Sequence, residues 1–304
     1  SIQAQADLLL DNSTGTILLM NAATGEVLAA ASHPGIDPSQ LDQLSQTWKS
    51  DPASPYLNRV LQGSYPLGTA AAPFLLARLA QISDLPPLPS PLSTYQNGEL
   101  WDCLQDPGKI DNLGSAIMAG CPAPTIQIAE TLTIDQISLL YHQLGFYSIP
   151  SLSLPQINPS TPQTVTHQID LLIGSGAPMI SPLQMGMAVS ALTNSGILPS
   201  PRFVLSVQTP DQGWVVLPEK SHSLVMDAEE LVDVTRLLQL HNIPAWHTLA
   251  QSRQADKTFT WFIGGTLPDW RGAPLALVIL LEEDAPDQAL KIGTDLFNFV
   301  FQAY

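Results

Sequence analysis

The sequence predicts an α/β (α+β) fold: a mainly antiparallel five-stranded sheet flanked by helices, with a helical subdomain inserted between its two halves. The first observation is the order of elements, which runs from a helix and two strands through a long helical stretch to three strands and a helix. The second is that most of the 27 prolines fall in the connections and rarely interrupt an element. The third is a hydrophobic content of 45% over 304 residues, which suffices for a proper core.

The first elements are a helix and a hairpin. Residues Ile2–Leu10 are typical of the end of a helix, and Thr16–Asn21 and Glu26–Ser32 predict two strands. Both strands are continuous apolar runs, so we expect them to be buried on both faces in the middle of a helix-covered sheet. Residues 33–68 predict a long connection that carries Pro, Ser and Asp.

The middle of the chain predicts helices. Thr69–Ile82 is rich in alanine and leucine and apolar on all sides, which indicates a deeply buried helix. Residues 111–146 predict two or three short helices, and Ser181 supplies the N-cap of a helix over Pro182–Asn194. Asp227–Leu240 predicts a helix with acidic residues in its first turn. Leu85–Pro91 and Ser151–Thr166 predict loops that carry prolines, and Phe203–Gln208 with Trp214–Leu217 predict a small surface hairpin.

The last third predicts three strands, Trp246–Gln251, Thr258–Gly264 and Pro274–Leu281, followed by an amphipathic helix over Pro286–Phe301. With the first hairpin these strands make up the five-stranded sheet.

We therefore expect one domain over residues 1–304. Its sheet part covers about 1–35 and 241–304, and its helical insertion covers about 56–240.

Charge and hydropathy exclude several classes of function. The net charge of −16 argues against binding to nucleic acid or to an anionic membrane surface. No apolar stretch is long enough to cross a bilayer, and the longest, such as Ala273–Leu281, have the length of a strand. There is no signal peptide at Ser1, so a membrane anchor is expected to lie outside this sequence.

The two cysteines, Cys103 and Cys121, are too few to define a framework. A disulfide between them would be compatible with an oxidising compartment, but we favour two buried free thiols. His241 and His247 are six residues apart with Pro244 between them, which is not a metal-binding spacing. We therefore predict no metal and no other cofactor.

Residues 56–73 resemble the start of a serine transpeptidase active site whose reactive groups are missing. In the transpeptidase domain of penicillin-binding proteins, a segment like Asn58-Arg59 leads into Tyr-Pro-Pro-Gly-Ser-Thr-x-Lys-Pro. The serine attacks a peptide or β-lactam carbonyl and the lysine takes its proton. Here Thr69 stands at the serine position and Ala72 at the lysine position. The frame survives as Tyr65, Pro66, Gly68 and Pro73.

Three further segments carry the resemblance over nearly the whole chain. Residues 24–29 read Thr-Gly-Glu-Val-Leu-Ala, like the family's first hairpin. Residues 180–185 read Ile-Ser-Pro-Leu-Gln-Met and, with 194–196, resemble a family helix that ends in Ala-Asn-Gly-Gly. Residues 261–264 resemble the Trp-Phe-x-Gly strand beside the active-site strand. Each match is weak, but all of them in the right order indicate the penicillin-binding protein transpeptidase fold.

The family's pocket needs Ser-x-x-Lys, Ser-x-Asn and Lys-Thr-Gly, and all three are altered. No serine has asparagine two residues later, and the place expected for that motif offers Gly120 and Pro122. No serine stands three residues before any lysine, whether Lys49, Lys109, Lys220, Lys257 or Lys291.

The best match to Lys-Thr-Gly is His247-Thr248-Leu249, in which only Thr248 survives. Leu249 replaces a glycine whose missing side chain lets substrate approach the strand. Lys257 begins another similar run, but it directly adjoins Trp261-Phe262, so we interpret it as the start of the second strand.

Thr69 with His247 as its base would be an unusual nucleophile, because the methyl group crowds the attack and Ala72 leaves the local base position empty. We interpret Thr69 as a helix N-cap, His247 as a hydrogen-bonded histidine at a strand end, and Glu282–Asp284 as a solvated turn. The tryptophans Trp246, Trp261 and Trp270 are interpreted as packing residues.

The sequence therefore predicts a pseudoenzyme: a degenerate transpeptidase-like domain that acts as a scaffold or regulator. The resemblance implies peptidoglycan synthesis or cell-envelope assembly, a place outside the cytoplasmic membrane, and partners among proteins of these processes. Two alternatives stay open. One is a weakly active D,D-transpeptidase that uses Thr69, and the other is a binding module whose apolar cleft is lined by Gly120, Ala70–Ala72 and Leu249.

Overall fold

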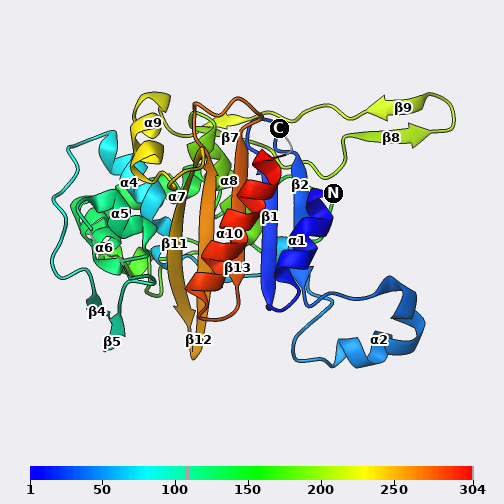
Figure 1. Ribbon diagram of the computed structural model, residues 1–304, viewed down its shortest axis with the longest axis horizontal. Coiled ribbons are helices and arrows are strands. Elements are labelled where there is room, and N and C mark those ends of the chain that lie inside the picture. Colours follow the sequence, from blue (N-terminus) through cyan, green and yellow to red (C-terminus); the bar gives the residue numbers. More distant parts are fainter. Residues whose placement is uncertain (97, 107–109, 303–304) are drawn as a thin grey trace.

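The computed structural model describes residues 1–96, 98–106 and 110–302, and its centre is an antiparallel sheet of five strands (Figure 1). The strand order is β11-β12-β13-β1-β2, so the first hairpin joins the last three strands through β1 and β13. All five predicted strands are confirmed: β1 Gly15–Asn21, β2 Val27–His33, β11 Ala245–Gln254, β12 Lys257–Thr266 and β13 Leu275–Leu281.

Helices cover both faces of the sheet, and alternate residues of β1 serve the two faces. Leu18 and Met20 join a hydrophobic cluster that includes residues of α8 (Pro182–Thr193). Ile17 and Leu19 join a second cluster with α1 (Ile2–Leu10) and α10 (Pro286–Phe301). Burial on both faces is thus confirmed for β1. It is wrong for β2, which is only half-buried because it is the last strand at its edge.

A helical lobe lies beside β11, on the left in Figure 1. The predicted helix over Thr69–Ile82 begins as a turn of 3-10 helix, η2 (Gly68–Ala71), and continues as α4 (Ala72–Ala80), which is buried almost all round as expected. The other helices of this part are α5 Leu113–Met118, α6 Pro122–Thr131, α7 Ile134–Gln143, η3 Gln168–Leu171 and α9 Ala228–Leu237.

Ser181 caps α8 as predicted, because its side chain accepts a hydrogen bond from the N–H of Gln184 at 3.2 Å. The Gln184 side chain in turn accepts from the Ser181 N–H at 2.9 Å, which completes a capping box.

The connection 33–68 holds more structure than predicted. It contains η1 (Pro38–Gln40), α2 (Leu41–Lys49) and α3 (Arg59–Gln62). No residue of α2 is buried, and this helix projects from the body (Figure 1).

Short strands complete the molecule. The predicted surface hairpin is confirmed as β8 (Ser206–Thr209) and β9 (Gly213–Val216), which project as an arm (Figure 1). The remaining strands are β3 Tyr65–Pro66, β4 Thr94–Gln96, β5 Glu99–Trp101, β6 Met179–Ile180, β7 Ile197–Leu198 and β10 Ser223–Leu224. None of the helices in the described ranges combines the length and hydropathy that crossing a bilayer requires.

Candidate functional site

Thr69 lies where η2 packs against the free edge of β11. Its hydroxyl donates to the main-chain carbonyl of Gln251 at 3.2 Å and accepts from the Gln251 N–H at 2.9 Å. The residue is only 4% exposed. The N-cap prediction is therefore wrong, because the strand edge and not the helix uses both functions of this hydroxyl.

Gly68 makes this close approach feasible. Its φ is +58°, and a Cβ atom there would lie 2.3 Å from the carbonyl oxygen of Gln251. Any larger residue would push η2 away from β11 and break the contacts of Thr69.

The neighbourhood of Thr69 is apolar. Ala70, Ala71 and Ala72 are all buried in the hydrophobic cluster of the helical lobe. In the described part of the chain, the Thr69 hydroxyl has hydrogen bonds to main-chain atoms of Gln251 alone. A main-chain amide cannot take up a proton near neutral pH. Lys109, one of the lysines inspected above, falls outside the described residues.

Gly120 and Pro122 lie in the turn between α5 and α6. Gly120 has a φ of +69°, and a Cβ atom there would lie 2.8 Å from Cδ1 of Leu104. Pro122 is the first residue of α6. Leu104 thus fills the space above a turn whose side chains supply no hydrogen-bonding group.

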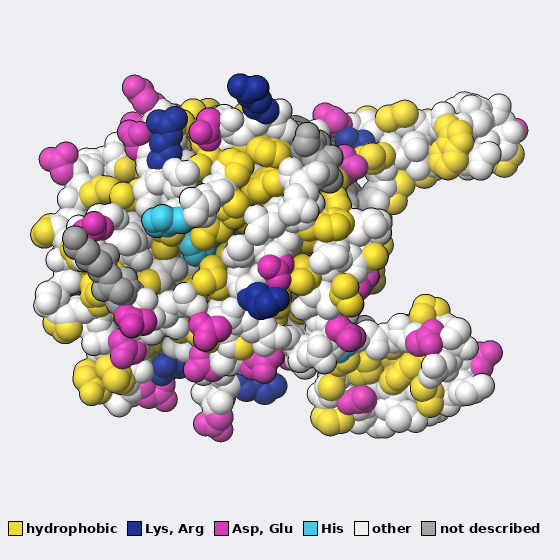
Figure 2. Space-filling model, viewed as in Figure 1, with side chains coloured by type: hydrophobic (Ala, Val, Ile, Leu, Met, Phe, Trp, Pro, Cys, Tyr) yellow, Lys and Arg dark blue, Asp and Glu magenta, His cyan; other side chains and the backbone are white. Residues whose placement is uncertain are grey.

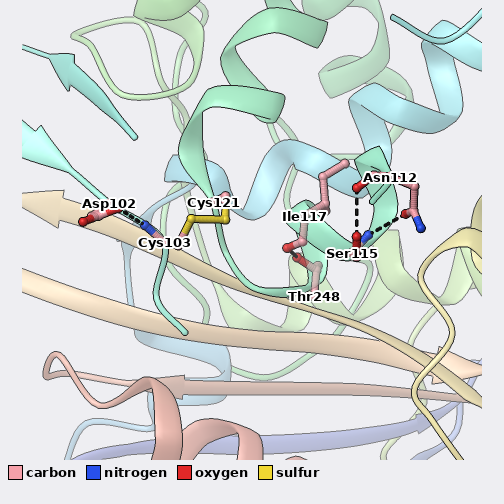
Figure 3. Close-up of a disulfide and its surroundings, with 7 residues drawn as sticks. All are labelled: Asp102, Cys103, Asn112, Ser115, Ile117, Cys121 and Thr248. Atoms are coloured by element: carbon pink, nitrogen blue, oxygen red, sulfur yellow. Dashed lines mark hydrogen bonds between the residues drawn. A yellow bond between two sulfur atoms is a disulfide. The ribbon is translucent and has the colours of Figure 1, made fainter. Parts of the chain in front are cut away.

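A disulfide joins Cys103 to Cys121 beside this turn (Figure 3). The interpretation as two free thiols is wrong, because the fold brings residues 18 apart in sequence into contact. The N–H groups of Leu104 and Gln105 both donate to the carbonyl of Ala119 at 3.1 Å. The disulfide and these hydrogen bonds hold residues 103–105 over the α5–α6 turn.

Residues 99–105, here called the strap, are also tied to the sheet. Arg253 of β11 pairs with Glu99 at 2.8 Å and stacks on Trp101 at 4.4 Å. At the other end Gln105 donates to Asp287 of α10 at 2.7 Å. The strap therefore spans from β11 to α10 and covers the α5–α6 turn on its way.

His247 is buried in β11 and does not face Thr69. Its ring stacks on Phe262 with a centroid distance of 5.3 Å, and burial, then the charge of His241, lowers the pKa of His247 to about 4. The described residues give its Nδ1 atom no hydrogen-bond partner, so the prediction of a hydrogen-bonded histidine is wrong.

The positions along β11 separate His247 from Thr69. Gln251 lies four positions beyond His247 along the strand, which is about 13 Å. That distance excludes His247 as a base for the Thr69 hydroxyl in this structure.

Thr248 and Leu249 serve packing. The Thr248 hydroxyl lies 2.9 Å from the carbonyl of Ile117 and links β11 to α5 (Figure 3). Leu249 belongs to the cluster under α10, whereas Ala70–Ala72 belong to the cluster of the helical lobe. The predicted apolar cleft lined by Leu249 together with Ala70–Ala72 is therefore wrong.

Sequence reasoning missed a buried ionic cluster near Tyr65. Arg59 is 2% exposed and pairs with Glu282 at 2.7 Å, while the Tyr65 hydroxyl donates to the same carboxylate oxygen at 2.8 Å. Burial, with the charge of Glu282 second, raises the pKa of Tyr65. The prediction of a solvated turn is wrong for Glu282. The fold brings Glu282, which follows the last residue of β13, to Arg59 of α3 across 223 positions of sequence, and no local pattern predicts this contact.

Several other interpretations are confirmed. Trp246 and Trp261 are fully buried, and their ring N–H groups donate to Thr193 and Ser252. Lys257 is the first residue of β12.

A cavity of about 230 Å³ lies next to Gly68. It lies between the strap, the end of β11 and a loop of the helical lobe, and its lining includes Pro66, Trp101, Leu172, Met179 and Arg253.

Solved structures define the class of fold. The crystal structure of PBPA from Mycobacterium tuberculosis matches with a TM-score of 0.81 at 18% identity, over 99% of this chain and 79% of that chain. A complex between penicillin-binding protein PBP2 and MreC from Helicobacter pylori matches with a TM-score of 0.76 at 18% identity, over 99% of this chain and 62% of that chain. The predicted penicillin-binding protein transpeptidase fold is confirmed.

The sequence defines the family. The family model of the penicillin-binding protein transpeptidase domain matches residues 15–260, and the chain belongs to this family. The peptidoglycan D,D-transpeptidase PbpA of Mycolicibacterium smegmatis is 28% identical over 234 residues, or 69% of this chain. The match covers 47% of that relative, so the chain spans about half its length.

Proposed function

We propose that this domain does not form an acyl-enzyme and that it acts as a scaffold or regulator in peptidoglycan synthesis or cell-envelope assembly. The observation that carries the proposal is the Thr69 hydroxyl, whose donor and acceptor functions are both used by main-chain atoms of Gln251. A hydroxyl becomes a nucleophile when a base within hydrogen-bond reach takes its proton, and Ala72 offers none.

The proposal treats seven positions as those of lost family motifs. They are Thr69 and Ala72 for Ser-x-x-Lys, Gly120 and Pro122 for Ser-x-Asn, and His247, Thr248 and Leu249 for Lys-Thr-Gly. Loss of a nucleophile or its base alone lowers the rate by on the order of four to six powers of ten. The changes fall on the reactive positions, while Tyr65 and Gly68 keep structural roles.

The setting of this function follows from the family. Relatives are named peptidoglycan D,D-transpeptidases, and a structural neighbour is in complex with MreC. We infer a place outside the cytoplasmic membrane, an anchor that is not among the described helices, and partners among proteins of peptidoglycan synthesis. The proposal includes one domain over 1–304, with a sheet part of about 1–35 and 241–304 and a helical insertion of about 56–240.

Labelling with a fluorescent penicillin tests the absence of an acyl-enzyme. After boiling in detergent, we expect no fluorescent band at the mass of the chain, and no turnover of a D-alanyl ester. Thr69→Val is the matched control because valine has the shape of threonine without its hydroxyl. A boil-resistant band that Thr69→Val loses would establish Thr69 as a nucleophile and refute the proposal.

A binding module is the second candidate, and the 230 Å³ cavity beside Gly68 is the observation that favours it. The Arg253 guanidinium at its wall is held by Glu99 and Gln251, so the wall is already organised. Thermal unfolding with added muropeptides separates the candidates. A raised Tm without covalent labelling supports the binding module, and an unchanged Tm supports the scaffold.

A further inference from the structure

The arm, residues 203–217, presents an apolar face to solvent. Trp214 is 70% exposed and Val216 is 75% exposed. Both lie on β9 two residues apart, so their side chains share one face of the hairpin. Figure 2 shows hydrophobic side chains along the projecting arm.

The two strands of the arm pair with each other and belong to no larger sheet among the described strands. An isolated two-stranded hairpin is marginally stable in water, and such a hairpin gains stability when another surface covers it. Two large exposed side chains on one face therefore favour an interaction surface over an unused loop.

A groove of about 440 Å³ lies at the base of the arm. This base groove is apolar along most of its length, and its hydrophobic lining includes Leu152, Leu154, Phe203, Val204 and Leu217. Its rim carries Arg202, Glu219 and Lys220. The volume and lining suit an aromatic side chain with an aliphatic neighbour.

The distribution of charge along the arm indicates which molecule would bind to the base groove. The chain carries −16 overall, so two copies repel each other over most of their surfaces. The arm has a single charged residue, Asp211, near its tip. At its base Arg202 is paired with Glu219 at 2.9 Å, whereas Lys220 donates to the uncharged Ser151. The tip therefore carries a negative charge, and Lys220 at the base forms no ion pair with a described carboxylate.

If two copies of the chain are related by a two-fold axis that passes between their arms, the negative tip of one arm can face the positive Lys220 at the base of the other. When two hairpins cross in opposite directions, the tip of each reaches the base of the other, and each contact occurs twice. Asp211 at the tip lies eight positions beyond Phe203 at the base, about 26 Å of extended chain, so the tip of one arm can reach the base of a second arm that crosses it.

We propose that two copies of this chain exchange arms, so that Trp214 and Val216 of each copy occupy the base groove of the other and Asp211 faces Lys220. This interface goes beyond the proposed function and does not depend on it. The contact is small, because an aromatic side chain buries roughly 150–250 Å², so we expect a weak dimer with a dissociation constant in the micromolar range.

Sedimentation velocity across the micromolar range tests the proposal. Trp214→Ser is expected to weaken the dimer at least about tenfold, since aromatic anchors dominate small interfaces. Leu8→Ser is the matched control: Leu8 is 68% exposed on α1, away from the arm, and its loss leaves the dimer unchanged. A protein that stays monomeric throughout, or equal effects of the two variants, would overturn the proposal.

Charge reversal tests the tip-to-base arrangement. Asp211→Lys and Lys220→Asp should each weaken the dimer about threefold, and their combination in one chain should restore it, because the attraction is rebuilt with opposite signs. Circular dichroism checks that each variant folds. If the combination is weaker than either single variant, the arms do not cross in this way. Binding of the monomer to lipid vesicles through Trp214 would assign the face to a membrane and reject the dimer.

Discussion

The segment 59–72 has two different ends. At one end the buried Arg59 pairs with the Glu282 carboxylate, and at the other end the buried Thr69 hydroxyl has hydrogen bonds only to main-chain atoms among the described residues. Arg59 and Tyr65 both bind Glu282, so the first end contains two opposite charges and a phenol. Thr69 binds main-chain atoms of Gln251, so no ionised group in the described ranges forms a hydrogen bond with its hydroxyl. The difference shows that this domain uses a buried ion pair where the connection meets the sheet, and places none of its described ionised groups against the hydroxyl whose proton would have to move.

The largest effect is expected from breaking the charged end. Arg59→Ala leaves the Glu282 carboxylate buried without its partner and should lower the free energy of unfolding by about 3–5 kcal/mol. Urea denaturation measures this loss. Lys291→Ala removes an exposed i,i+4 pair with Asp295 and should change stability by less than about 0.5 kcal/mol. Equal losses in the two variants would show that burial of the Arg59 pair has no special cost.

The strap borders the cavity beside Gly68, next to Thr69. Removing its disulfide tests how much the strap contributes to stability relative to the Arg59–Glu282 pair. Replacing Cys103 and Cys121 together with alanine should cost about 3 kcal/mol, because the bond closes a loop with a separation of 18 residues. Wild-type protein unfolded with a reductant present should match the variant. If the variant is as stable as the oxidised wild type, the hydrogen bonds of Leu104 and Gln105 alone hold the strap.

The pH dependence of stability tests whether β11 tolerates a positive charge on the buried ring of His247. Burial lowers the pKa of His247 to about 4 in the folded chain, from an ordinary value of 6.5, so the unfolded chain binds more protons between these values. Stability is therefore complete above about pH 6.5, and falls by about 2 kcal/mol between pH 7 and pH 5. His247→Phe keeps a ring against Phe262 and should lose this part of the slope. An unchanged slope in the variant would assign the acid sensitivity to other groups.

The smallest effect is expected at the neutral end itself. Thr69→Val removes both hydrogen bonds to Gln251 and should cost about 1–2 kcal/mol, measured by urea denaturation. Thr131→Val is the control, because Thr131 is exposed and bonds only within its own helix. A loss as large as that of Arg59→Ala would remove the distinction between the two ends.

The sequence was sufficient for the five strands of the sheet, since each is a long apolar run, whereas the order of the strands came from the structure. The cap of α8 was also predictable, because Ser181 and Gln184 act within one turn. The absence of a lysine at position 72 was visible in the same way.

What the sequence did not provide depends on contacts between distant segments. The bond between Cys103 and Cys121 requires the strap to cross the α5–α6 turn, and the contact of Thr69 with Gln251 requires η2 to meet the edge of β11. Glu282 was misinterpreted because its neighbours in sequence are acidic and exposed, while its partner Arg59 lies on another element. Local composition describes none of these distances.

The burial of Ala72 limits which side chains the position can accept. Ala72 is 2% exposed in a hydrophobic cluster, so a lysine there would bring an ammonium group into apolar surroundings before any serine could use it. A serine at position 69 alone would still find its oxygen held by the strand. Under the proposed function, restoring acyl transfer would therefore require coordinated substitutions at several positions, because a lysine introduced at position 72 alone would destabilise the core.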